Sequence, residues 1–334
     1  MTHAPRFLHV ANGTSTTTSI EASGIGGAVS IWADPLCEGP VPGGISDDAL
    51  VDVRASFLSN PDDPSSADPV NDLRQWRRAI DEAGAYDELV LWYEHDLFDQ
   101  LNLIQLLTYV RAHVPADTAV SLVCIGSFPG RPQFKGLGEL PPEAFPGLLA
   151  QRQTVTGEQY AAAAHAWDAF RTPSPLPVEG LLRAGTPALP FLAPALRRLL
   201  EEYPATGDGL SRTERRLLQL TALEPVELRA VFPYMHEDER AYYIGDTSLV
   251  ALALALASAS PRLLSFVREG SFERPLSAVV TLTDAGRAVL DQRLDRVACG
   301  LDRWLGGVHL RTGGEMWRWD PSSGGVTRDR TRPR

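Results

Sequence analysis

The feature that most constrains the fold is a set of short apolar runs that are continuous rather than alternating. A strand buried on both faces of a parallel sheet has this pattern, whereas a strand with one solvated face alternates apolar and polar residues. Segments with helical character separate the runs, as the crossovers of a parallel sheet require. The runs are FLHVANG at 7–13, AVSIW at 28–32, ELVLWY at 88–93 and AVSLVCIG at 119–126, and helices are expected at 14–23, 46–58, about 70–84 and 97–113. The sequence therefore predicts an α/β fold, with a Rossmann-like parallel-sheet domain over residues 1–140.

The rest of the chain differs in character from this first domain. Residues 141–208 are expected to form a helical connector, which proline-rich stretches such as Thr172–Pro177 interrupt. Inside the first domain, the polar stretch 59–69 is expected to be a linker between two helices. The segment 321–334 is rich in Gly, Ser and Arg and is predicted to be a disordered tail.

Residues 209–320 are predicted to form a winged-helix-like domain. LSRTERRLL begins a helix with Ser211 as the N-cap and Glu214 as its capping-box partner. TLTDAGRAVL predicts a strand followed by a helix, an order that is similar to one common in bacterial winged-helix regulators. The segment Gly306–Asp320 is expected to be a hairpin that turns at Thr312–Gly314.

Composition and charge exclude several classes of protein. The three cysteines of the 334 residues are far apart, which indicates a reduced, cytoplasmic chain without a disulfide framework or zinc site. The longest apolar run, Leu249–Ala257, is far shorter than the roughly 20 residues that a membrane-spanning helix needs. The start of the chain also lacks the pattern of a signal peptide. Residues 1–204 carry 13 basic and 25 acidic residues, so we expect no nucleic-acid surface there.

Acidic side chains gather at the end of the third apolar run, in VLWYEHDLFDQ. Asp96 suits the N-cap of the following helix, with Asp99 as a capping-box partner, and this interpretation needs no chemistry. It leaves Glu94 unexplained, because a carboxylate at the end of a buried strand needs a partner. A metal, a ligand or an arginine such as Arg131 would each serve.

The position of this cluster on the fold favours a catalytic interpretation. Ligands of parallel sheets bind outside the carboxyl ends of the strands, where the cluster falls. Neighbouring acids also raise one another's pKa, as a general acid or base requires. The candidate catalytic residues are Glu94, His95, Asp96, Asp99 and Gln100.

A second candidate element, HVANGTSTTTS, follows the first apolar run. A turn at Asn12 and Gly13 leads into a helix that opens with hydroxyl side chains, beginning with Thr14 and Ser15. The free N–H groups at a helix N-terminus and the hydroxyls suit a phosphate. Simple N-capping by serine or threonine explains the hydroxyls equally well. The glycine spacing matches neither a nicotinamide-binding fingerprint nor a P-loop.

Further acids lie in the loop after the second run. Asp34 and Glu38, together with Glu94 and Asp96, would form an oxygen-rich Mg²⁺ site if the loops meet. A proline- and glycine-fixed turn with solvated acids is the favoured interpretation of Asp34. Glu94 and Asp96 are therefore the candidate metal ligands, and Glu38 a candidate on the rim.

The glycine-rich loop after the fourth run, at 125–138, offers additional groups on the same rim. Ser127, Arg131 and Lys135 would meet an anion there, although a solvated loop is the favoured interpretation. Cys37 is a nucleophile in principle, but no histidine near it in sequence supports that role.

With these residues described, the chain resembles a bacterial family known as domain of unknown function 1835. The resemblance implies a shared architecture and rim site, but no activity. Members of the family often carry an acid at the position of Thr14 and a histidine at that of Cys37. If those positions served a metal, this chain would bind it less well. The matching stretches are LHVANG, the loop Trp32–Pro42, Leu89–Leu107, LVCIGSFPG, RQTVT, Ala188–Pro204, GLSRTERRLL and GDTS.

These patterns lead to one functional hypothesis and one alternative. The first is an enzyme that acts on a phosphate-bearing substrate, such as a nucleotide or an RNA end, by metal-assisted hydrolysis or transfer. The alternative is a ligand-sensing regulator whose winged helix contacts DNA or a partner protein. Nearby acids dilute the cluster of Arg212, Arg215 and Arg216, so contact with nucleic acid is not favoured.

Overall fold

The computed structural model describes residues 5–59, 68–271 and 274–329. The described residues form two compact units, which divide between Ala195 and Leu196. Most of the linker predicted at 59–69, and the last five residues of the chain, lie outside the described residues.

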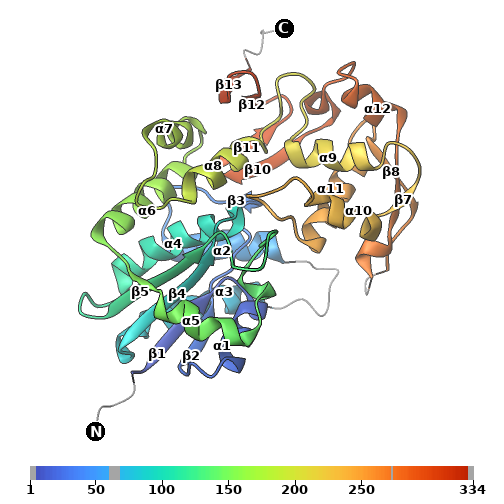
Figure 1. Ribbon diagram of the computed structural model, residues 1–334. Helices are drawn as coiled ribbons and strands as arrows, with labels where there is room; N and C mark the ends of the chain where they lie inside the picture. The colour runs from blue at the N-terminus through green and yellow to red at the C-terminus, as the bar shows by residue number, and fades with distance from the viewer. Residues whose placement is uncertain (1–4, 60–67, 272–273, 330–334) are drawn as a thin grey trace. The chain divides into compact units, whose positions relative to one another are not determined.

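The first unit is built on a sheet whose strand order is β2-β1-β4-β5-β6 (Figure 1). β1, β2, β4 and β5 run parallel, and the short β6 is antiparallel to β5. The predicted parallel sheet is thereby confirmed. The chain goes from β1 outward to β2 and then returns to the other side of β1 for β4, so the order reverses between β1 and β4. The strands are β1 (Phe7–Ala11), β2 (Ala28–Ile31), β4 (Glu88–Glu94), β5 (Ala119–Ile125) and β6 (Gln153–Thr154).

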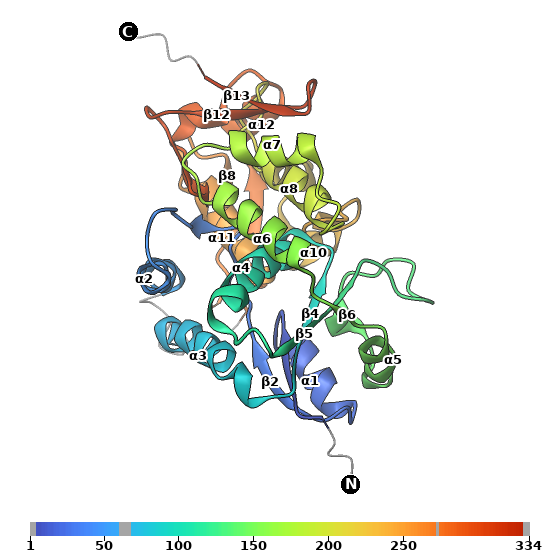
Figure 2. The same ribbon diagram turned by 90° about the vertical axis from the view of Figure 1, so that its left-hand side faces the viewer.

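Helices cover both faces of this sheet. Figure 2 shows α1 and α5 on one side, and α2 and α3 on the other. Coverage on both sides explains the continuous apolar runs of the strands, because alternate side chains are buried against opposite layers. The helices are α1 (Thr14–Ala22), α2 (Asp47–Leu58), α3 (Pro69–Asp81), α4 (Leu97–His113), α5 (Phe145–Ala150), α6 (Gly157–Phe170) and α7 (Leu176–Ala184). The two-residue β3 (Gly39–Pro40) precedes α2, and α8 (Leu192–Leu200) passes through the division between the units.

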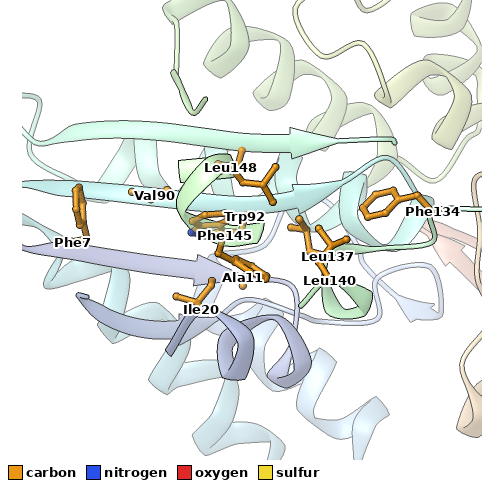
Figure 3. Close-up of a cluster of buried hydrophobic side chains, with 11 residues drawn as sticks. Phe7, Ala11, Ile20, Val90, Trp92, Phe134, Leu137, Leu140, Phe145 and Leu148 are labelled. Atoms are coloured by element: carbon orange, nitrogen blue, oxygen red, sulfur yellow. The ribbon is translucent and has the colours of Figure 1, made fainter. Parts of the chain in front are cut away.

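The core between the sheet and the layer of α1 and α5 is strongly apolar. Val90 and Trp92 of β4 point into it, together with Ile20 of α1 and Phe145 of α5. Figure 3 shows side chains of the loop after β5, among them Leu137, closing this cluster at the carboxyl ends of the strands. This loop is therefore anchored in the core directly beside the end of β4.

The structure agrees with the predicted helix boundaries where the caps are clear. α4 has the predicted bounds, and the side chain of Ser46 caps α2 as expected. The prediction of an all-helical stretch after residue 141 is wrong at β6, which pairs with β5. A two-residue strand is too short to produce an alternating pattern, and its partner is far away in the sequence.

The second unit contains a small sheet of order β7-β9-β8, whose strands are antiparallel, and helices that precede and follow its strands. The predicted capping box of Ser211 and Glu214 is confirmed at α9, and Thr283 caps α12. The elements are α9 (Arg212–Leu220), β7 (Val226–Glu227), α10 (Leu228–Met235), α11 (Asp246–Ala257), β8 (Leu264–Arg268), β9 (Val279–Leu282) and α12 (Asp284–Leu290).

Two predictions for the end of the chain are wrong. The hairpin expected to turn at Thr312–Gly314 does not form, because β11 pairs with β10 and β12 pairs with β13. The tail expected to be disordered from residue 321 contains β13, which buries part of its surface beside β12. The strands are β10 (Asp302–Gly306), β11 (Val308–Arg311), β12 (Trp317–Asp320) and β13 (Gly325–Arg328). Among the helices of the described residues, none has both the length and the apolar surface to cross a membrane.

Candidate functional site

The candidate site lies where the strand order reverses. Ligands of open α/β sheets bind outside the carboxyl ends of the strands at such a point, because the loops diverge there and leave a crevice. Asn12 directly follows β1, and Glu94 is the last residue of the neighbouring β4. A cavity of about 380 Å³ opens between them. Its lining residues are Asn12, Gly13, Thr14, Ser15, Thr16, Glu94, Lys135, Gly136, Gly138 and Glu139.

The side-chain amide of Asn12 joins the two strand ends. Its Nδ2 donates to both carboxylate oxygens of Asp99, at 2.9 and 3.1 Å, and its Oδ1 accepts a hydrogen bond from the Thr16 hydroxyl at 2.9 Å. Both ends of the amide are therefore occupied. Asn12 thereby holds the loop after β1 against α4, and its predicted role as a phosphate ligand stays a prediction.

Asp99 is the buried centre of this network. Besides Asn12, its Oδ2 accepts the backbone N–H of Glu94 at 2.5 Å. The sequence predicts that Asp99 closes a capping box with the N-cap, and the structure instead places its carboxyl group under the end of β4. Burial, and then the neighbouring carboxyl groups of Glu94 and Asp96, raise the pKa of Asp99 above its usual range.

Two acids line the cavity, and Glu94 is the buried one, whereas Glu139 is exposed. The side chain of Glu94 is only 4 % exposed, and its Oε1 accepts a hydrogen bond from the backbone N–H of Leu137. Burial, followed by the charge of Asp96, raises the pKa of Glu94 to about 8, although the bond from Leu137 opposes this. At neutral pH the carboxyl group is therefore mostly protonated, and it is able to donate a proton.

A glycine lets the loop after β5 approach Glu94 so closely. A Cβ atom at Gly136 would lie 2.4 Å from Glu94 Oε2 and 2.9 Å from its Cδ. A Cβ atom at Gly138 would lie 3.0 Å from the Cβ of Ser15, on the opposite wall of the cavity. These contacts show that the KGLG stretch is packed against both the acid and the start of α1.

The start of α1 supplies the other wall. The N-cap is Gly13, which has no side chain to bond the first N–H groups of the helix. The interpretation of simple N-capping by a hydroxyl residue is therefore wrong for α1. Thr14 and Ser15 are exposed at the cavity, and Lys135 lines it from the loop after β5. Helix N–H groups, hydroxyls and an ammonium together suit an anion.

The remaining predicted catalytic residues have structural partners. Asp96 is the N-cap of α4, as one interpretation expected, because its Oδ1 accepts the backbone N–H of Asp99 at 2.8 Å. Gln100 donates from Nε2 to the carbonyl oxygen of Glu94 at 2.5 Å. His95 lies between two phenyl rings, with its ring centroid 6.2 Å from those of Phe134 and Phe191.

Three residues predicted at the rim do not line the cavity, among the residues described around it: Glu38, Ser127 and Arg131. Ser127 and Arg131 are exposed, and the carbonyl oxygen of Glu38 accepts from Arg54 Nη1 at 2.6 Å. The sequence suggested Arg131 as a partner of Glu94, but the backbone N–H of Leu137 bonds this carboxyl group instead. Lys135, Gly136 and Gly138 line the cavity although the sequence favoured a solvated loop there, and the two glycines that follow the chain's single lysine are the signal for them.

The four-carboxylate Mg²⁺ site is not assembled. Asp34 is 2 % exposed and forms a bidentate salt bridge with Arg54, at 2.6–3.0 Å. In the described part of the chain, no three His, Cys, Asp or Glu side chains are placed to hold one metal ion. A Mg²⁺ ion on Glu94 and Asp96 stays a prediction, and the chemistry below is derived from the side chains alone.

Comparisons of this chain with models of protein families and with curated proteins gave no match. The resemblance to domain of unknown function 1835 therefore stays a prediction. The function is argued from the geometry and chemistry of the site, since a fold alone does not specify an activity.

Proposed function

We propose that the chain is an enzyme that acts on a phosphate-bearing substrate, with Glu94 as its general acid and base. One observation supports this proposal: a buried carboxyl group and the start of helix α1 line the same cavity. The wall formed by α1 and Lys135 would hold the phosphate. Glu94, on the opposite wall, would then lie beside the oxygen atoms at which phosphate esters are cleaved or transferred.

The residues divide this work between binding and proton transfer. The N–H groups at the start of α1, the hydroxyls of Thr14 and Ser15, and the ammonium of Lys135 would neutralise the anion. Protonated Glu94 would donate to the oxygen of the leaving group, because a pKa of about 8 leaves the proton in place at neutral pH. A water molecule or an acceptor hydroxyl would form the new bond to phosphorus as the bond to the leaving group breaks, and the Glu94 carboxylate would then take up the proton that this nucleophile releases. Mg²⁺, if bound, would supply further charge neutralisation at the phosphate.

The architecture supports this placement. We infer that the sheet of the first unit is Rossmann-like, because parallel strands with helical crossovers lie on both sides of one reversal of strand order. The helix after β1 begins at the wall of the cavity where the phosphate would bind, as the first helix does in Rossmann-like folds. The fold supports the position of the site, whereas the proposed chemistry depends on Glu94.

The proposal is tested by activity and binding together. Full-length protein would be assayed between pH 6 and 9 for phosphate release from p-nitrophenyl phosphate, sugar phosphates and nucleoside monophosphates, with and without Mg²⁺. We expect a rate that falls as the pH rises through about 8, because the protonated acid is lost. Glu94→Gln should lower kcat roughly 10²–10⁴-fold, while its binding of inorganic phosphate persists.

The matched control is Glu143→Gln, which removes an exposed carboxyl group near the same loop and should leave the rate unchanged. Normal turnover in Glu94→Gln would contradict the role of Glu94. A protein that neither binds inorganic phosphate in calorimetry nor cleaves any of the probes would contradict the proposed function as a whole.

A regulator remains the second candidate, for one specific reason. We infer that residues 209–290 form a winged helix, since α9, β7, α10, α11, β8 and β9 follow one another in the order of that motif and the sheet order is β7-β9-β8. α11, in the position of a DNA-reading helix, carries only Asp246 as a charged residue and exposes Leu254. This surface favours contact with protein rather than DNA.

A further inference from the structure

The first unit holds a second cavity, of about 260 Å³, beside the end of β5. Its walls are apolar, and the four leucines that line it are all buried: Leu103, Leu122, Leu148 and Leu189. The half-buried ring of Phe191 and the exposed side chains of Gln151 and Gln153 are also part of the lining. Apolar walls with a few polar groups are typical of sites for small organic molecules.

The sheet presents backbone groups to this cavity. The short β6 lies beside β5 (Figure 2). It pairs with β5 only at Ser121 and Leu122, and the Val155 N–H donates to the Val120 carbonyl oxygen at 2.9 Å. Because peptide groups of alternate residues in a strand point to the same edge, the N–H and C=O of Cys124 point to the edge that faces β6. In this register Gln151 corresponds to Cys124, but β6 begins only at Gln153, two residues further along the chain. A donor and an acceptor on one residue therefore lie at the wall of the cavity.

We propose that this cavity binds the base of a nucleoside or nucleotide. The N–H and C=O of a single residue match the adjacent donor and acceptor on the edge of a purine or pyrimidine. The leucines would enclose the two faces of the ring, and Phe191 offers an aromatic surface for stacking. The amides of Gln151 and Gln153 would bond the exocyclic groups.

A peptide strand fits this edge less well than a base. β5 ends at Ile125. Cys124 is therefore the last residue of β5 whose N–H and C=O groups point to the outer edge of the sheet, past the end of β6. Addition of a strand needs a run of such residues, because each contributes only one pair of hydrogen bonds. The edge therefore matches a ligand of about one residue in length.

The base cavity adjoins the site at Glu94. Gln100 lines the base cavity, and its Nε2 donates to the carbonyl oxygen of Glu94 at 2.5 Å and lies 3.5 Å from Cys124 Sγ. His95, the residue after Glu94, is in ring contact with Phe191 of the base cavity. A nucleotide would thus place its base here and its phosphate at α1. This identification of the substrate rests on the proposed function, whereas the base cavity itself does not.

The test separates base from phosphate. Adenosine, guanosine, cytidine and uridine, which lack phosphate, would be titrated calorimetrically into the full-length protein, alongside ribose 5-phosphate and inorganic phosphate. We expect at least one nucleoside to bind. Gln151→Trp places an indole at the mouth of the cavity and should weaken that binding at least ~10-fold. Gln75→Trp, at an exposed glutamine on α3, is the matched control and should leave it unchanged.

A second variant guards against an indirect effect of the tryptophan. Phe191→Ala removes the stacking surface and should also weaken nucleoside binding, while inorganic phosphate binds as before. The proposal is overturned if no nucleoside binds, or if nucleoside affinity is equal in wild type, Gln151→Trp and Phe191→Ala. Nucleoside binding without any binding of phosphate would support the base cavity and count against the proposed function at Glu94.

Discussion

At the scale of single residues, the site depends on a carboxyl group that the fold keeps protonated. Glu94 is buried beside Asp96 and Asp99, and three carboxyl groups so close together do not all ionise at neutral pH. The N–H groups that bond Asp99 and Glu94 favour their charged forms, but burial outweighs these bonds and raises the pKa of both carboxyl groups. An uncharged residue at this position would therefore raise the free energy of unfolding, so stability alone does not explain a glutamate here.

The free energy of unfolding should fall as the pH rises from about 4.5 to about 8. In this range the folded protein keeps the Glu94 proton that the unfolded chain releases, so the unfolded state binds fewer protons and gains stability. Glu94→Gln should remove the part of this loss that Glu94 causes, and at pH 8.5 it should be roughly 2–4 kcal/mol more stable than wild type. Urea unfolding at pH 4.5 and 8.5 measures the effect, with Glu143→Gln as the control. An equal pH dependence in wild type and Glu94→Gln would show that the pKa of Glu94 is not raised.

At the scale of elements, local signals in the sequence predicted the positions of helices and strands better than they predicted which strands pair. α4 was predictable because Asp96 caps it and an apolar run precedes it, and the same reasoning places Glu94 at the end of β4. The hairpin expected at Gly306–Asp320 was wrong, because which strands pair depends on contacts far apart in the sequence.

The candidate site was predictable to the same extent. The position of Asn12 and Glu94 at neighbouring strand ends followed from the parallel pattern. The approach of Gly136 to Glu94 did not, since no local signal specifies how a loop folds back over a strand end. The partner of Asp34 was also not predictable from local signals, because Arg54 lies in α2, the next helix along the chain.

The loop after β2 and the helix α2 depend on the pair of Asp34 and Arg54. The side chains of Asp34 and Arg54 are 3 % and 1 % exposed, so removal of the arginine leaves a buried carboxylate without its partner. Arg54→Met should lower the free energy of unfolding by roughly 3–5 kcal/mol. Arg74→Met breaks the exposed pair with Asp52 and should cost less than about 1 kcal/mol. Chemical denaturation of both variants makes the comparison, and losses of similar size would show that the buried pair is not special.

At the scale of the whole molecule, charge differs along the chain. Residues 1–204 carry 13 basic and 25 acidic residues, whereas residues 205–334 carry 18 and 17. The arginines in the second unit that would otherwise form a positive stripe are paired with acids. The pairs are Arg212 with Glu201, Arg215 with Asp208, Arg216 with Glu237, and Arg318 with Asp295 and Asp329. Charges paired in this way leave little field to attract a polyanion.

We therefore expect no measurable binding of the full-length protein to a mixed-sequence DNA duplex at physiological salt. Non-specific affinity for DNA comes from release of counterions by unpaired Lys and Arg side chains, and α11 offers none of either. Fluorescence anisotropy of a labelled duplex, measured from about 50 to 200 mM salt, tests this because non-specific affinity falls steeply over that range. Binding that weakens in this way and is lost in Arg212→Ala or Arg216→Ala would show that the ion pairs open toward DNA. That result would turn the assignment toward a regulator, whose first unit senses a ligand at the cavity of Glu94. An anisotropy that stays flat while the same protein binds phosphate would leave the chemistry at Glu94 as the activity that the fold supports.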